Sequence, residues 1–431
     1  MKHILKAAFS LVALLSAPAA RAETIVITGA TIHTSLAPEP VTGATLILRD
    51  GRIAALGKDV AVPKDARVID ASGRIVTAGL MASETALGTT EVAAAEATVD
   101  NAVTREGRIG PAFDIASAVN PDSVLLSHVR ADGLTRAFSV PQRSAVSPFA
   151  GQGAILRLND GPDIIDRRQA AMFVRIGGRA AEQAGGSRAA QWQTLRQGFD
   201  EAKLFTPPGR AANESLLSLR ELRTLLPVLD GKMPLAVGVS RASDIREAIA
   251  IAAAYNLRLI IVGAEEAWRV APELAARNIP VVMDPGLDHL STYDNIGARP
   301  DAAAMLHKAG VTLAFMTSGG RGTWDAGVAL REGAGFAVAA GLPWVEALKA
   351  MTINPARVWG IDGHYGAIAP GKDADVVIWD GDPLEVTTAP VAVFVRGQEV
   401  SLHTRQKQLS ERYSPLRTGS PTAACAKDGC K

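Results

Sequence analysis

Side chains able to do chemistry follow several of the apolar runs in this sequence. Five of them are candidates for a functional site: Glu84, Arg241, Glu265, His289 and Ser318. Carboxylates bind hard cations such as magnesium or calcium, and a guanidinium can bind a substrate carboxylate through two parallel hydrogen bonds. A serine nucleophile needs an adjacent base that a third group orients. We therefore look first for a site at the strand ends that precede these residues.

Each candidate also has an ordinary structural interpretation. Glu265 is typical of the first turn of a helix, where the positive end of the helix dipole stabilises a carboxylate. Arginine, as at position 241, often covers apolar surface, and His289 lies in a loop, DPGLDHLSTYD. No Gly-x-Ser-x-Gly sequence surrounds Ser318 and no histidine stands near it. Nucleophilic catalysis by that serine is therefore disfavoured.

The middle of the chain alternates short apolar strands with helical stretches. Strands are predicted at MPLAVGVS (233–240), LRLIIVG (257–263), IPVVMDP (279–285) and VTLAFMT (311–317), each followed by a helical pattern. Parallel strands need such crossover helices, so we expect a parallel sheet. A closed barrel and an open doubly wound sheet both fit this count. Residues 143–223 are less periodic and rich in glycine.

The two ends of the chain have a different pattern from the middle. Residues 24–69 read as short strands and hairpins, with a turn at Asp50 and Gly51. Strands return near the other end as ADVVIWDG and VAVFVRG. We expect the two ends to form one small β domain.

The chain begins with a pattern typical of a secretory signal peptide. Lys2 and Lys6 precede an apolar run, and Ala20-Arg21-Ala22 fits a cleavage site. The run is too short to span a bilayer. We expect residues 1–22 to be removed and the mature protein to be periplasmic or secreted, with no membrane anchor.

The charge balance argues against two classes of partner. The sequence has 45 basic and 44 acidic side chains, and loss of Lys2, Lys6 and Arg21 with the signal leaves 42 against 44, a net charge of −2. This balance gives no electrostatic argument for nucleic acid or an anionic membrane. The cysteines, Cys425 and Cys430, would meet an oxidising compartment, and the sequence leaves open whether they are bonded.

Two segments resemble the amidohydrolase superfamily, particularly its imidazolonepropionase-like branch. They are GRIVTAGLMASETALG (73–88) and TINPARVWGIDGHYGAIAPGKDADVVIWDGDP (352–383). The resemblance implies a (β/α)8 TIM-like barrel over residues 73–359, with its site at the carboxyl ends of the strands. It also implies a small β-sandwich domain from residues 23–72 and 360–403, followed by a tail over residues 404–431.

The resemblance also implies a metal centre whose ligands are missing here. Members of the superfamily use one or two divalent ions, held by histidines, a lysine or glutamate, and an aspartate, to activate water. The positions of the first-strand pair and of the fifth-, sixth- and eighth-strand ligands fall on Glu84 and Ala86, on residues 237–240, on Gly263 and Ala264, and on Ser318. The fourth-strand residue cannot be placed from the sequence.

Two hypotheses follow. The first is an exported superfamily member without the His/Asp metal pair, catalytically impaired, that binds a small-molecule ligand or pairs with an active relative. The second is an active hydrolase of C–N bonds in cyclic amides or small peptide-like substrates, with an atypical metal or carboxylate site. No cofactor is predicted, and zinc is expected only under the second hypothesis.

Overall fold

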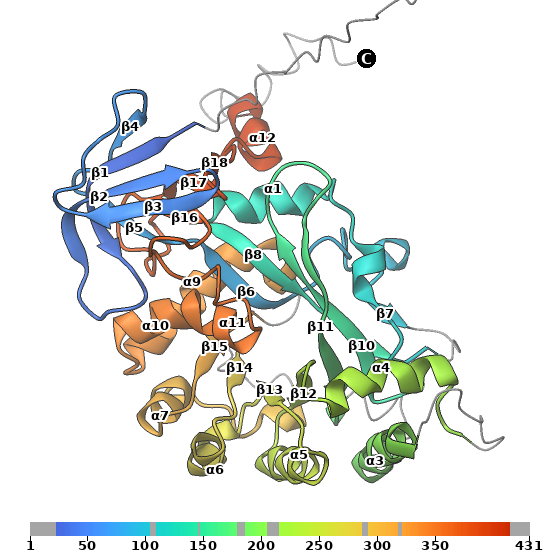
Figure 1. Cartoon of the computed structure of the whole chain (residues 1–431). Helices are drawn as coiled ribbons and strands as arrows, with labels where there is room; N and C mark the ends of the chain where they lie inside the picture. The colour runs from blue at the N-terminus through green and yellow to red at the C-terminus, as the bar shows by residue number, and fades with distance from the viewer. Residues whose placement is uncertain are drawn as a thin grey trace, which may run out of the picture.

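The computed structural model describes residues 23–103, 109–144, 147–178, 186–204, 215–286, 292–317 and 321–413. It contains a mixed sheet built from both ends of the chain and a barrel built from the middle (Figure 1). Within these ranges, no helix combines the length and apolar composition needed to cross a membrane.

The β domain is one mixed sheet with strand order β18-β17-β16-β5-β1-β2-β3, and β4 also pairs with β1. The turn between β2 and β3 is formed by Asp50 and Gly51, both with positive φ, as a tight hairpin requires. This confirms the predicted turn. The strands are β1 (Ile25–His33), β2 (Val41–Arg49), β3 (Arg52–Gly57), β4 (Arg67–Asp70), β5 (Ile75–Ala78), β16 (Val376–Trp379), β17 (Pro390–Val395) and β18 (Gln398–Glu399).

The barrel sheet has strand order β15-β14-β13-β12-β11-β10-β8-β6. The two end strands, β15 and β6, contact each other, so the sheet is nearly closed and is a barrel rather than an open sheet. Its strands are β6 (Leu80–Thr85), β8 (Leu134–Ser139), β10 (Phe149–Arg157), β11 (Ile165–Arg175), β12 (Leu235–Val239), β13 (Leu259–Gly263), β14 (Val281–Met283) and β15 (Leu313–Phe315). A two-stranded pair, β7 (Ala102–Val103) and β9 (Arg143–Ser144), lies beside it.

One barrel strand departs from the all-parallel pattern that the sequence predicts. β10 pairs antiparallel with both β8 and β11, whereas β11 to β15 are parallel neighbours. The connections into and out of β10, residues 140–148 and 158–164, are too short for a crossover helix, and antiparallel strands need none. The first part of the glycine-rich region that lacked helical periodicity, residues 149–175, is therefore a long hairpin, and the helix α3 (Arg188–Leu204) follows it.

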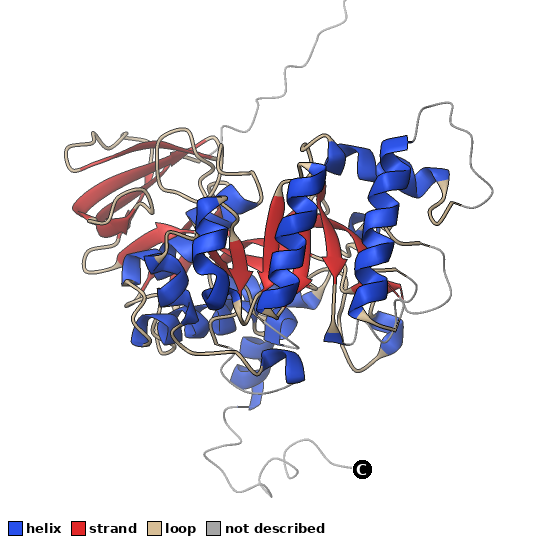
Figure 2. Ribbon diagram, turned by 90° about the horizontal axis from the view of Figure 1, so that it is seen from below, coloured by secondary structure: helices blue, strands red, loops and turns tan. Residues whose placement is uncertain are grey.

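Helices cover the outside of the barrel strands (Figure 2). The α-helices are α1 (Val124–Ala131), α3 (Arg188–Leu204), α4 (Leu219–Leu229), α5 (Ala242–Tyr255), α6 (Ala271–Ala276), α7 (Ala302–Lys308), α8 (Arg321–Trp324), α9 (Ala326–Ala339), α10 (Trp344–Ala350), α11 (Ile353–Val358) and α12 (Arg405–Tyr413). Short 3₁₀ turns are η1 (Glu96–Thr98), η2 (Ile115–Ala118), η3 (Ala267–Val270) and η4 (Tyr293–Asn295). The start of the predicted tail is thus a helix, α12, none of whose residues is buried.

The inside of the barrel is filled by side chains below the carboxyl ends of the strands. Phe138 packs on Phe173 and on Trp359, with ring centroids 5.6 and 4.2 Å apart. A Cβ at Gly153 would lie 2.3 Å from the Phe138 ring, so only glycine leaves room for this ring stack. The barrel is a packed core, and a ligand can enter it only at the strand ends.

A buried arginine joins the barrel to the β domain. Arg136, in β8, has no exposed side-chain surface, and its guanidinium lies 2.8 Å from the carboxylate of Asp373 and 3.1 Å from that of Asp375. Both aspartates belong to the GKDAD sequence that leads into β16. That sequence therefore has a structural role, since its carboxylates, together with that of Asp166 at 3.5 Å, neutralise a buried charge.

Candidate functional site

A cleft of about 1030 Å³ opens at the carboxyl ends of the barrel strands. We call it the mouth. Strand ends β6, β11, β12 and β13 and the segment after β15 contribute Glu84, Arg175, Gly238, Gly263 and Thr317 to its wall. Because parallel strands end at one edge of the sheet, these residues come together although they are far apart in the sequence.

The centre of the mouth holds an ion pair between the first and fourth barrel strands. The Arg175 Nη2 lies 2.8 Å from the Glu84 Oε1, and the side chains are only 17% and 13% exposed. Arg175 is the fourth-strand residue that sequence analysis could not place. Its guanidinium also lies over the Phe173 ring, 5.5 Å from the centroid, so its orientation is fixed on two sides.

Both partners of the pair keep an unused polar atom. Glu84 Oε2 and Arg175 Nε are buried and have no hydrogen-bond partner among the described residues. Thr90 and Thr317 also line the mouth. Their hydroxyl oxygens are buried too and have no hydrogen-bond partner among the described residues. Buried polar groups are usually paired, so four unsatisfied atoms around one cleft indicate space for a ligand or ordered water.

Glycine at position 238 leaves room for the arginine. A Cβ there would lie 2.8 Å from the Arg175 Cδ and 2.9 Å from its Nη1. Gly238 stands on the fifth strand, β12, within the segment where the superfamily would place a histidine. Any side chain at this position would push Arg175 away from Glu84.

Glu265 faces a different space from Glu84. It follows Ala264, whose φ of 64° is uncommon for a residue other than glycine, and it lines a very small cavity with Asp284. Burial raises the pKa of Glu265, although a hydrogen bond with Ser240 opposes the shift. Its Oε2 has no hydrogen-bond partner in the described chain.

Arg241 is engaged at the rim and does not reach the centre of the mouth. Its Nη2 lies 2.8 Å from Asp294, which also accepts hydrogen bonds of 2.6 Å from Arg188. Arg188 in turn pairs with Asp244 at 2.9 Å. The predicted candidates thus separate: Glu84 lies at the centre, Arg241 at the rim and Glu265 beside the mouth. His289 and Ser318 lie outside the described residues.

The described part of the mouth is poor in metal ligands. No three histidine, cysteine, aspartate or glutamate side chains in the described ranges are grouped closely enough to hold one ion. Glu84 is followed two residues later by Ala86, and β13 ends in Gly263. The carboxylate at the first strand already has a guanidinium as its partner.

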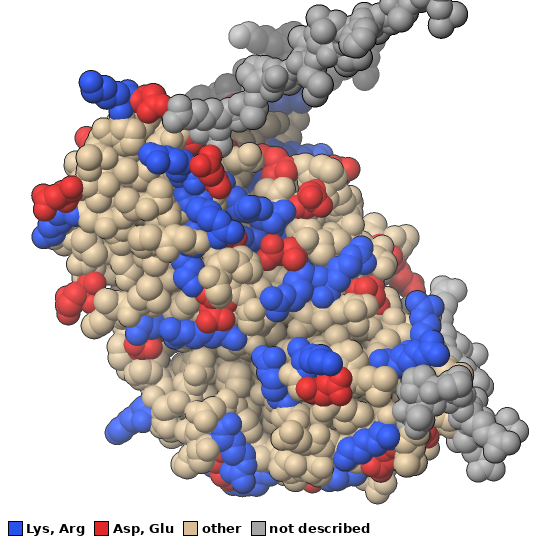
Figure 3. Space-filling view, in the orientation of Figure 1, with Lys and Arg blue, Asp and Glu red and all other residues tan. Residues whose placement is uncertain are grey.

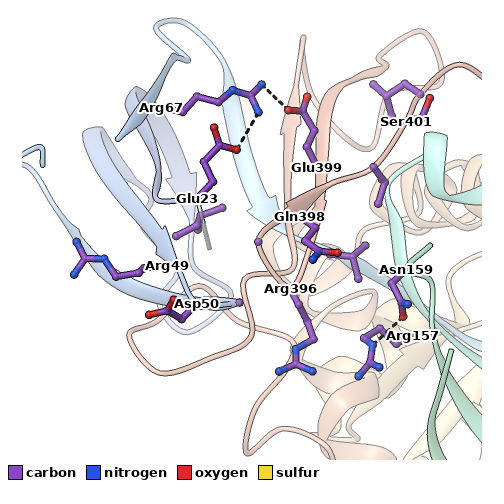
Figure 4. Close-up of a pocket in the computed structure, with 16 residues that line it drawn as sticks. Glu23, Arg49, Asp50, Arg67, Arg157, Asn159, Arg396, Gln398, Glu399 and Ser401 are labelled. Carbon is purple, nitrogen blue, oxygen red and sulfur yellow. Dashed lines mark hydrogen bonds and ion pairs between the residues drawn. The ribbon is translucent and has the colours of Figure 1, made fainter. Parts of the chain in front are cut away.

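A larger cleft, of about 1220 Å³, lies between the β domain and the barrel (Figure 4). Two of its arginines are paired with carboxylates: Arg67 lies 2.6 Å from Glu399, and Arg157 lies 3.3 Å from Asp166. On the face that Figure 3 shows, acidic and basic side chains are also interspersed. We place the candidate site at the mouth, where buried polar atoms are unsatisfied.

Comparisons with known proteins agree with this architecture. The model of the amidohydrolase family matches residues 285–402. The amidohydrolase tasK of Hapsidospora irregularis is 38% identical over 99 residues, which are 23% of this chain and 10% of that protein. The imidazolonepropionase of Maricaulis maris is 39% identical over 90 residues, which are 20% of this chain and 22% of that protein. These matches thus span less than a quarter of the curated relatives' length.

Solved structures match over much more of the chain. An amidohydrolase from Thermotoga maritima MSB8 has a TM-score of 0.78 at 25% identity, covering 88% of this chain and 99% of that one. A prolidase complexed with N-methylphosphonate-L-proline has a TM-score of 0.57 at 17% identity, covering 88% and 99%, and supports the fold alone. The fold is that of an amidohydrolase barrel with an attached β domain. The chain belongs to the amidohydrolase superfamily.

Proposed function

We propose that the mature chain is an exported, ligand-binding member of this superfamily that lacks the dimetal centre and has little or no hydrolytic activity. The observation that carries the proposal is the ion pair at the centre of the mouth, where Arg175 Nη2 lies 2.8 Å from Glu84 Oε1. A guanidinium stays protonated in proteins and has no lone pair to give to a metal.

The electrostatics of the pair oppose a bound dication. A doubly charged ion placed about 4 Å from a guanidinium would be repelled by roughly 8 kcal/mol at an effective dielectric constant of about 20. The remaining wall offers alanine and glycine at ligand positions, Ala86 and Gly263, which supply no imidazole or carboxylate. In this proposal the guanidinium neutralises Glu84 in the place of a metal.

The unsatisfied atoms indicate the chemistry of the ligand, for which the two side chains have to shift because both atoms are buried. Glu84 Oε2 can accept a hydrogen bond and Arg175 Nε can donate one. A cyclic amide or imide presents an N–H and a C=O on one edge, which complements this pair. The volume of the mouth, about 1030 Å³, is close to the upper end of the range of small-molecule sites, roughly 300–1,000 Å³.

The test combines binding and turnover on the same ligands. Purified mature protein is titrated with a panel of cyclic imides and dipeptides by calorimetry, and each is assayed for hydrolysis with and without added zinc. We expect binding of at least one cyclic amide or imide, weakened by Glu84→Gln, and no hydrolysis. Absence of binding across the panel, or zinc-dependent turnover, contradicts the proposal.

One observation favours the second candidate, an active hydrolase of C–N bonds with an atypical carboxylate site. The pKa of Glu265 is raised by burial, as in carboxylic acids that donate a proton during catalysis. If the protein hydrolyses a panel member, Glu265→Gln tests this candidate. Loss of turnover with unchanged binding supports it, and unchanged turnover excludes Glu265 as the proton donor.

A further inference from the structure

A groove on the opposite end of the barrel carries unpaired positive charge. It has a volume of about 550 Å³ and lies where β12, β13 and β14 begin, far along the strands from the mouth. Three arginines line it: Arg258, Arg277 and Arg357. No carboxylate lines the groove, and in the described part of the chain none lies within ion-pair distance of these guanidinium groups. We call it the basal groove.

The arginines stand at three helix ends. Arg258 follows the end of α5, Arg277 is the residue that ends α6, and Arg357 is in the last turn of α11. Cations at helix carboxyl ends are stabilised by the helix dipole, which is an ordinary structural role. Even if each end carried its full charge of about −0.5, three guanidinium charges would leave a net positive potential.

The floor between the arginines is apolar. It is formed by Ile249, Leu259, Ile279 and Val358, whose residues keep 5–7% of their surface exposed. A ligand lying in the groove can therefore reach them. Among the described residues, no aromatic side chain lines the groove to provide the stacking that usually holds a nucleotide base.

We infer that the basal groove binds a single-chain alkyl carboxylate, with the head group on the arginines and the chain along the apolar floor. A guanidinium binds a carboxylate through two parallel hydrogen bonds, and burial of the chain adds a non-directional attraction. The groove lies outside the mouth, so this inference does not depend on the proposed function.

Titration calorimetry with decanoate tests the inference, with decyltrimethylammonium as a probe of equal chain and opposite charge. Decanoate is expected to bind and the cation is not. Each methylene added from octanoate to dodecanoate should strengthen binding by up to about fourfold. Equal binding of both probes, or no dependence on chain length, overturns the inference. Binding of anionic phospholipid vesicles without binding of free decanoate overturns it too, since the source is then a membrane.

Substitutions locate the site. Each of Arg258→Ala, Arg277→Ala and Arg357→Ala should weaken decanoate binding about two- to fivefold, as expected for exposed ion pairs. The corresponding lysine variants keep the charge but lose the two parallel hydrogen bonds, so they should recover only part of the affinity that the alanine variants lose. Arg405→Ala, in α12 at the far end of the molecule (Figure 1), is the matched control and should change nothing. Unchanged binding in all three alanine variants overturns the assignment, and thermal unfolding confirms that they are folded.

Discussion

The Arg175 guanidinium of β11 and the Glu84 carboxylate of β6 lie 2.8 Å apart, and their contact joins the fourth and first barrel strands at the mouth. Each partner would be a partly buried, uncompensated charge without the other. Removal of one partner of a buried pair costs more than removal of both, because the remaining charge stays desolvated.

A double-mutant cycle should detect this coupling. We expect Glu84→Gln and Arg175→Met to be non-additive in urea unfolding, with a coupling energy of about 0.5–3 kcal/mol that favours the native pair. Arg168→Met is the control in combination with Glu84→Gln, and the two effects should be additive. Arg168 is 54% exposed, and the carboxylate that it lies near, at 3.6 Å, is that of Asp114. Additive effects of the two mouth variants would contradict a stabilising pair.

The position of Arg175 depends on the absence of a side chain at residue 238. Gly238→Ala should displace the arginine and destabilise the protein by about 1–3 kcal/mol, as overpacked sites do. Ligand binding at the mouth should weaken together with stability. Gly363→Ala is the matched control, because no atom of the residues that the structure describes lies within 4 Å of a Cβ there. Equal stability of the two variants would mean that the Arg175 side chain can adopt another conformation at no cost in stability.

The junction between the barrel and the β domain should be sensitive to its buried charge. Arg136→Met leaves the carboxylate of Asp375 without its guanidinium and that of Asp373 with only the more distant Arg52, and we expect a loss of about 3–5 kcal/mol in the free energy of unfolding. Arg52→Met removes an arginine that is 50% exposed and 3.6 Å from Asp373, and should cost below about 1 kcal/mol. Similar losses for both variants, measured by urea unfolding, would be inconsistent with the buried cluster.

Acid should weaken the same junction through Asp166. Burial alone would raise the pKa of this carboxyl, but a hydrogen bond with His364 and the charges of Arg136 and Arg157 lower the pKa to about 2. A carboxyl with a lowered pKa stabilises the fold above its unfolded pKa of 3.8 and loses this contribution as the pH falls towards 2. The contribution is at most about 2 kcal/mol.

Urea unfolding from pH 6 to pH 2 measures this loss. The difference in stability between the native protein and Asp166→Asn should be constant above about pH 4 and shrink as the pH falls to 2. Asp122→Asn, at an exposed position, should show no such trend. A difference that grows on acidification would reverse the sign of the argument.

Much of the fold could be predicted from the sequence, because aliphatic strands alternate regularly with helical stretches from residue 233 onward. The direction of β10 was not predicted, because the glycine-rich region around it lacks a pattern that delimits the strands, and only the strand bounds show that its connections are too short for crossover helices. For the same reason Arg175 was missed. It ends the second strand of a hairpin, and its one sequence signal is the apolar run AAMFV that precedes it.

The site was predicted in part. Glu84 was expected at the mouth from the resemblance and lies there, since its position follows from strand order alone. Arg241 follows the fifth barrel strand as predicted, but it forms an ion pair at the rim with Asp294, which belongs to η4, far away in the sequence. Glu265 turns into a separate small cavity after Ala264. Partners from distant loops cannot be read from local patterns.

The most direct test of the central claim, that Arg175 occupies the place of a metal, is the zinc content of the purified mature protein. The protein is incubated with excess zinc, exhaustively dialysed and measured by mass spectrometry of the metal. We predict a zinc content far below one ion per chain. The neutral control Gly363→Ala should give the same low zinc content as the native protein. One tightly bound zinc ion per chain, lost in Glu84→Gln, would contradict the account.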